Sequence, residues 1–161
     1  RYQEGVQQVL LNGEDVSGLI RTEEVGNMAS AVSGYMPVRE KLVELQKQLA
    51  AKENVIMDGR DIGTCVLPDA PAKIYLTASV EVRAARRYKE LLEKGMKADL
   101  KEIEKDIEDR DYRDMHREHS PLKQAEDAVL LDTSSMTLDQ VVEEILKIVR
   151  EKGYKADGGQ A

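Results

Sequence analysis

The chain of 161 residues contains no tryptophan and no phenylalanine, and its aromatic content is only 4%. Its core must therefore be aliphatic. Aromatic platforms that stack single-stranded nucleic acid are not expected. The net charge of -7 also argues against a duplex partner, because duplex-binding proteins usually carry a basic surface. The composition thus predicts a single soluble domain, with room for a small subdomain and with no nucleic-acid partner.

Cysteine is almost absent as well. Cys65 is the one cysteine and stands in an apolar run, so no disulfide can form within the chain. This fits a reducing cytosol, and Cys65 is expected to be a small core residue rather than a catalytic thiol. No apolar run approaches the length of a membrane span, and no signal-peptide pattern is present. We expect a cytoplasmic protein without a membrane partner. The start at Arg1, without methionine, indicates a fragment.

The periodicity of apolar residues predicts strands that alternate with helices, which indicates an α/β protein with a parallel sheet. Thr22 is expected to cap a short helix that ends at Gly34, and Thr137 with Gln140 forms a capping-box pattern. The expected elements are a hairpin with its turn at 12–15, strands at 55–57, 73–77 and 128–131, helices at 22–34, 37–52, 80–94, 100–118 and 137–153, and a disordered tail at 156–161.

The most informative segment is Asp58-Gly59-Arg60-Asp61-Ile62-Gly63-Thr64, which directly follows the predicted strand 55–57. In open α/β sheets, ligands bind beyond the carboxyl ends of the strands. Three interpretations are open from the residues alone. The segment is a tight turn in which Arg60 pairs with neighbouring acids, a two-carboxylate Mg²⁺ site, or a recognition site in which Arg60 binds phosphate and Asp61 binds a base or sugar.

Arginines are concentrated on two consecutive predicted helices. Their spacing of three and four residues places each group on one helical face. One interpretation is a solvated helical hairpin held by ion pairs. The other is a mobile flap that closes guanidinium groups on phosphates, since the planar fork of arginine matches phosphate oxygens. His116 and His119 are expected to be surface residues. The two arginine groups are Arg83, Arg86 and Arg87, and Arg110, Arg113 and Arg117.

These segments together closely resemble the bacterial cytidylate kinase family. The resemblance is carried by residues 57–64, by Pro68-Asp69-Ala70 and Lys73-Ile74-Tyr75-Leu76-Thr77-Ala78-Ser79, and by both arginine groups. It extends to Gly13-Glu14-Asp15-Val16-Ser17, Ile20-Arg21-Thr22 and Pro121-Leu122, and so covers nearly the whole chain up to the last helix. It implies a P-loop nucleoside monophosphate kinase fold, with a parallel sheet and helices on both faces. The activity it implies is transfer of the γ-phosphoryl group of ATP to CMP or dCMP with Mg²⁺.

The resemblance also implies roles for individual residues. Cytosine would be contacted by Ser30, Arg39 and Asp61, the CMP phosphate by Arg60 and Arg117, and the sugar hydroxyls by Arg110 and Asp114. Arg83, Arg86 and Arg87 would lie in a lid over the ATP phosphates, and Arg86, Arg87 and Arg117 would be catalytic. No protein metal ligand is expected. The implied parts are a CMP-binding domain at 1–53, an α/β core at 54–82 and 121–155, a helical lid at 83–120, and the tail at 156–161.

One feature of the family is missing. No glycine in the chain is followed by lysine, so the P-loop pattern Gly-x-x-x-x-Gly-Lys-Ser/Thr is absent. The fold is therefore expected to be truncated at its N-terminal side. A cleaved N-terminal segment is a possible partner, and the fragment is expected to be inactive without its P-loop, the element that with the substrate phosphates would mainly hold Mg²⁺. The alternatives are a non-catalytic nucleotide- or phosphate-binding module and another small-molecule P-loop kinase.

Overall fold

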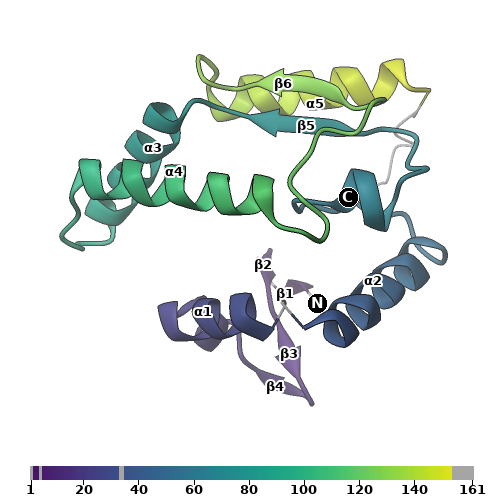
Figure 1. Ribbon diagram of the computed structural model, residues 1–161, viewed down its shortest axis with the longest axis horizontal. Helices are drawn as coiled ribbons and strands as arrows, with labels where there is room; N and C mark the ends of the chain where they lie inside the picture. Colours follow the sequence, from purple (N-terminus) through teal and green to yellow (C-terminus); the bar gives the residue numbers. More distant parts are fainter. Residues whose placement is uncertain (1, 4, 33–34, 154–161) are drawn as a thin grey trace. The chain divides into compact units, whose positions relative to one another are not determined.

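The computed structural model describes residues 2–3, 5–32 and 35–153, and it divides into two compact units. The first unit comprises residues 1–55 and the second residues 56–161. Figure 1 shows the helices and strands of both. The predicted tail at 156–161 lies outside the described residues. No described helix is long and apolar enough to cross a membrane.

The first unit contains two small antiparallel hairpins and two helices. Strands β1 (Tyr2–Gln3) and β2 (Val6–Gln7) form one hairpin, and β3 (Leu10–Leu11) and β4 (Glu14–Asp15) form the other. The second hairpin turns at Asn12 and Gly13, which both have positive φ, as expected for such a turn. Helix α1 (Glu23–Val32) begins after Thr22, whose hydroxyl accepts a hydrogen bond from the Val25 amide.

Helix α2 (Met36–Ala50) completes the first unit, close to the predicted helix at 37–52, and carries proline in its first turn, where proline is well tolerated. Four apolar residues recur along it at helical spacing and form a stripe, but all four side chains are exposed. Within the first unit the stripe therefore contributes little burial. The stripe consists of Val38, Leu42, Leu45 and Leu49.

The second unit is built on a parallel pair of strands. Strand β5 (Ile74–Thr77) pairs with β6 (Val129–Asp132), with Ile74 opposite Val129 and Thr77 opposite Asp132. The crossover between them contains helices α3 (Val80–Glu93) and α4 (Leu100–His116), which pack side by side (Figure 1). Helix α5 (Leu138–Glu151) follows β6 and begins with the predicted capping box of Thr137 and Gln140. This α/β arrangement confirms the predicted fold class.

The core of the second unit is small and aliphatic. Its buried apolar side chains come from the turn before β5, from the residue directly after β5, and from α3, β6 and α5. Leu76 and Leu130, which lie on the two strands, are more than half exposed. Parallel strands are usually covered on both faces, so this exposure is unusual. The buried residues are Val66, Ala78, Ala84, Leu131 and Ile148.

The prediction of a strand at 55–57 is wrong. These residues form no regular element, and Ile56 is fully exposed. A strand needs a neighbour to satisfy its backbone groups, and within the described part of the chain β5 pairs with β6 alone. The charged segment 58–64 therefore follows an extended, unpaired stretch rather than the end of a buried strand.

Candidate functional site

The segment 58–66 forms a compact turn that presents its charged residues before the chain enters the core. After the bend at Gly59 and Arg60, residues Ile62–Val66 wind into one π-helical turn, in which the Val66 and Leu67 amides donate to carbonyls five residues earlier. Val66 is buried and anchors the end of this turn. A Cβ at Gly59 would lie 2.9 Å from the Ile62 side chain, so a larger residue there would force that side chain to move. The turn is thus a fixed base for Arg60 and Asp61.

Arg60 is paired with an acid on the last turn of α4. Its Nε donates a hydrogen bond to Oδ2 of Asp114, which is 54 positions away in sequence. Arg110, four residues earlier on the same helix, approaches the same oxygen to 4.0 Å. The Asp114 side chain is only 18% exposed, whereas Arg60 is 40% and Arg110 64% exposed. One carboxylate therefore holds two guanidinium groups together at the surface.

Arg117 lies just beyond α4 and has a donor left over. Its Nε donates to the Ser120 carbonyl, and the Leu122 amide donates to the Asp114 carbonyl at 2.8 Å, so the chain folds back on the helix end. Nη2 of Arg117 is buried and has no hydrogen-bond partner among the described residues. A buried guanidinium nitrogen without a partner costs free energy unless a ligand satisfies it. Nη2 of Arg117 is therefore a donor that a bound anion could satisfy.

The three arginines of α3 are placed differently from one another. Nε of Arg83 donates to the Ala78 carbonyl, and its two terminal nitrogens contact Asp111 of α4 at 3.1 and 2.6 Å. Arg86 donates to Oγ1 and the carbonyl of Thr133 at 3.2 and 2.6 Å, at the carboxyl end of β6. The first two arginines thus bind the protein itself, while Arg87 pairs with Glu90 on the exposed surface.

The buried lysine Lys73 packs against the turn at 58–66. The Lys73 side chain is 7% exposed, and its Nζ donates to the Pro68 carbonyl and to Asp127, with an ion pair of 2.7 Å. The hydrogen bond from Lys73 is the main reason that the pKa of the Asp127 carboxyl lies below its usual value. The Lys73 stem also passes 3.4 Å from the position of a Cβ at Gly63. Lys73 therefore links the turn at 58–66, called the motif turn below, to the start of β6.

The remaining predicted residues belong to the turn and to the first unit. Asp61 is half-buried at the start of the π-helical turn. Arg39 is half-buried on α2. Ser30 belongs to α1, and its side chain lies outside the described part of the structure. The structure thus brings together Arg60, Arg110 and Asp114, with Arg117 one turn further along.

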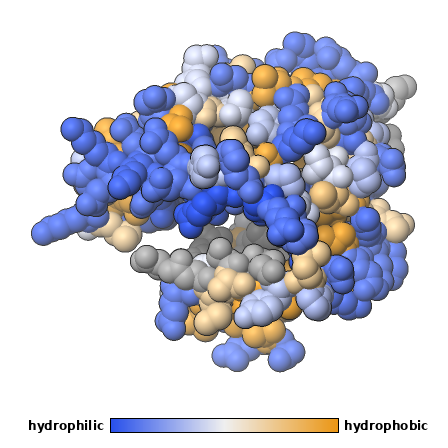
Figure 2. Space-filling view, in the orientation of Figure 1, coloured by the Kyte–Doolittle hydropathy of each residue, from blue (hydrophilic) through white to orange (hydrophobic). Residues whose placement is uncertain are grey.

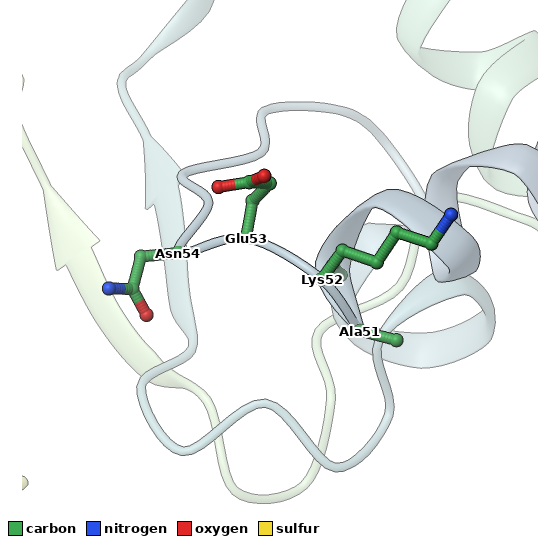
Figure 3. A pocket seen from close by; sticks show the side chains of 5 residues that line it. Ala51, Lys52, Glu53 and Asn54 are labelled. Carbon is green, nitrogen blue, oxygen red and sulfur yellow. The ribbon is translucent and has the colours of Figure 1, made fainter.

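Other surfaces offer weaker sites. A hollow after α2 is lined by five consecutive residues, Ala50 to Asn54, whose labelled side chains point in different directions (Figure 3). Side chains that point in different directions do not converge on a ligand. No group of three or more metal-ligating side chains occurs among the described residues. His116 and His119 are exposed, as predicted, and the ring of His116 stacks on Tyr112. Figure 2 shows a largely hydrophilic surface over α3 and α4.

Sequence reasoning missed the residues that organise this region. Asp111 was not singled out, although it continues the half-buried positions Ile103 and Ile107 at four-residue spacing. An aspartate at a position where the stripe would otherwise continue with an apolar residue is a signal that could have pointed to Asp111. Lys73 gave no signal, because a lysine at the start of a predicted strand is normally exposed.

Comparison with known proteins identifies relatives of the chain over most of its length. The family model described as cytidylate kinase matches residues 1–151. Cytidylate kinases of Lactobacillus johnsonii and Lactobacillus gasseri are each 55% identical over 152 residues, which cover 94% of this chain and 66% of the relative. The cytidylate kinase of Ligilactobacillus salivarius is 50% identical over 148 residues, which cover 92% of this chain and 66% of the relative. The chain therefore spans 66% of the length of these relatives.

Proposed function

The chain belongs to the cytidylate kinase family, and on that premise we propose that it carries the acceptor-nucleotide site of an enzyme that phosphorylates CMP or dCMP with ATP. In this reaction a phosphate oxygen of CMP attacks the γ-phosphorus of ATP, and the bond from that phosphorus to the bridging oxygen breaks. The products are CDP, or dCDP, and ADP.

The observation that carries the proposal is the unpartnered Nη2 of Arg117 beside the Arg60–Asp114–Arg110 cluster. Arg60 and Arg110 both contact the single carboxylate of Asp114, and Arg117 adds a third guanidinium group three residues further along the chain, so this region retains positive charge for a phosphate. Arg60 and Arg117 would hold the phosphate of CMP, because charge-assisted hydrogen bonds from arginine are strong and directional. Asp114 and Arg110 would hold the sugar hydroxyls. On binding, the phosphate would compete with Asp114 for Arg60.

Recognition of cytosine is assigned to Asp61. Its carboxylate would accept a hydrogen bond from the N4 amino group of cytosine. Uracil has a carbonyl at this position, which would meet the carboxylate lone pair to lone pair, and mismatched polar groups of this kind are rejected strongly. Ser30 and Arg39 remain further cytosine contacts that the family resemblance predicts.

This chain offers fewer groups for binding ATP and Mg²⁺ than for binding CMP. The described residues offer no cluster of metal ligands, so Mg²⁺ would be held mainly by the phosphates and by a P-loop, which the sequence lacks. When bound, Mg²⁺ supplies neutralising charge to the phosphates. Arg87, exposed on α3, is the arginine of the predicted lid best placed to reach toward phosphates, because it pairs with the neighbouring side chain of Glu90, whereas Arg83 and Arg86 bind groups of α4 and of the end of β6.

The absence of a Gly-Lys pair favours a second candidate, a non-catalytic CMP-binding module. Such a module would keep Arg60, Asp61 and Arg117 but would not transfer phosphate. The two candidates share the acceptor site and differ in turnover.

The test is an assay of ADP formation from ATP and CMP. The chain alone should give no turnover. Adding the part of the Lactobacillus johnsonii relative that lies outside the matched region should produce turnover with CMP. Arg117→Lys in the same mixture should abolish most of it, and Arg113→Lys should not. Tight CMP binding without turnover in the mixture would support the non-catalytic module instead, and no CMP binding at all would refute both candidates.

A further inference from the structure

Each of the three side-chain nitrogens of Arg83 donates a hydrogen bond within the second unit. Nε binds the Ala78 carbonyl at 2.9 Å, directly after β5, and Nη1 and Nη2 form a fork on the two carboxylate oxygens of Asp111. The two side chains are 34% and 25% exposed. A bidentate pair of this kind fixes orientation as well as distance. Arg83 thus connects the end of β5, helix α3 and helix α4.

Asp111 occupies a special place on α4. Ile103 and Ile107 are half-buried, and Asp111 follows them at the same spacing of four residues. Apolar contacts alone would allow α4 to slide or rotate against α3, since they are not directional. At the last position of this stripe, the bidentate pair between Asp111 and Arg83 takes the place of an apolar contact. The fork therefore adds a directional contact to the packing of α4 on α3 near the carboxyl end of α4.

Arg110 and Asp114, the two residues of α4 that are proposed to bind the nucleotide, lie on the helix face next to that of Asp111. Successive residues of a helix are about 100° apart, so Asp111 and Arg110 project to different sides. Arg110 and Asp114 form one face, four residues apart, and meet Arg60 from the motif turn. Any rotation of α4 would move these groups away from Arg60. The Arg83–Asp111 pair is thus a directional contact that helps to set their position.

We propose that Asp111 is a positioning residue for the CMP site, which acts through Arg83 and touches no substrate itself. Arg83 then serves as the anchor of α4 instead of a ligand of the ATP phosphates. The inference rests on the proposed function for its effect on CMP binding. Its structural part, the placement of Arg110 and Asp114 against Arg60, can be tested without any nucleotide.

The test compares Asp111→Asn with Asp106→Asn, an identical change at an exposed position of the same helix. Asp111→Asn should raise the dissociation constant for CMP about tenfold, as expected for a contact within a coupled network. Asp106→Asn should leave it unchanged. Asp111→Glu, which keeps the carboxylate, should recover part of the affinity. All titrations are made well below the thermal unfolding midpoint of each variant, so that a loss of folded protein does not count as a loss of affinity.

A second readout uses the chain without nucleotide. The side-chain Nε–Hε resonances of Arg60 and Arg110 in NMR spectra report their contacts with Asp114. They should move toward the values of free arginine in Asp111→Asn and stay in place in Asp106→Asn. Unmoved arginine signals in Asp111→Asn would overturn the inference, and so would a CMP affinity no weaker than that of Asp106→Asn. If the unmodified chain binds no CMP, the proposed function fails, and the arginine signals still decide the role of Asp111.

Discussion

At the scale of single residues, the candidate site depends on which arginines are already engaged. Arg83 and Arg86 bind protein oxygens, whereas Arg117 has a buried donor without a partner among the described residues. Sequence spacing could not make this distinction, because it assigns residues to helix faces but does not show what each face meets. The sequence did single out Arg60, Arg110, Asp114 and Arg117, and the structure places these four on the motif turn and at the end of α4.

Arg117→Lys tests the unused donor. Lysine keeps the charge but cannot offer the guanidinium fork. The dissociation constant for CMP should rise about ten- to a hundredfold, which corresponds to one charge-assisted hydrogen bond, while the thermal midpoint should change little. Isothermal titration calorimetry gives the affinity. Arg113→Lys, one helical turn earlier, is the matched control, and an equal loss of affinity in both variants would contradict the role of Arg117.

Asp61→Ala tests base recognition. Without the carboxylate the preference for CMP over UMP should fall by at least about tenfold, with little change in thermal stability. The control is Asp69→Ala, which removes an exposed carboxylate from the next turn. Competition titrations with CMP and UMP measure the preference. A variant that still strongly prefers CMP would refute the assignment of Asp61.

Asp127 makes stability depend on pH. Its pKa in the folded chain is lowered, chiefly by the hydrogen bond from Lys73. Its contribution to stability is therefore complete above the ordinary aspartate pKa of about 3.9 and is lost as the pH falls through the lowered value. Asp127→Asn should be less stable than the parent at pH 7, and the difference should shrink in acid. Urea unfolding at several pH values checks this, with Glu126→Gln as the control. A difference independent of pH would contradict the ion pair.

At the scale of elements, local sequence signals predicted most boundaries correctly. The caps at Thr22 and Thr137 and the proline of α2 act within a few residues of themselves, so the sequence contains their whole explanation. The strand at 55–57 was wrong because a strand depends on a distant partner, which an apolar run does not reveal. The Arg83–Asp111 and Lys73–Asp127 pairs join residues 28 and 54 positions apart. Contacts at that separation are not visible in local patterns.

Thr137→Ala tests the capping box of α5. The Thr137 hydroxyl accepts from the Gln140 amide, and the Gln140 side chain accepts from the Thr137 amide. Loss of the hydroxyl should lower the free energy of unfolding of the second unit by about 1 kcal/mol. Urea unfolding followed by helical circular dichroism measures the change. Ser135→Ala, at an exposed position just before the helix, should have almost no effect, and an equal effect would argue against the cap.

At the scale of the whole molecule, the residues of the second unit that are proposed to bind the acceptor nucleotide are supported by a small core. Leu76 and Leu130 on the two strands, and Leu138 at the start of α5, are exposed. Apolar surface of this kind commonly marks a site of interaction. The chain spans 66% of the length of its relatives and contains no P-loop pattern. Acceptor binding and phosphoryl transfer can therefore be tested as separate properties.

The most direct measurement is a calorimetric titration of the chain with CMP and, in parallel, with UMP. Saturable binding of one CMP per chain, clearly tighter than that of UMP, is the expected result, since Arg60, Asp61 and Arg117 belong to this chain. Equal affinity for both nucleotides, or no binding of either, would contradict the assignment of an acceptor-nucleotide site to these residues.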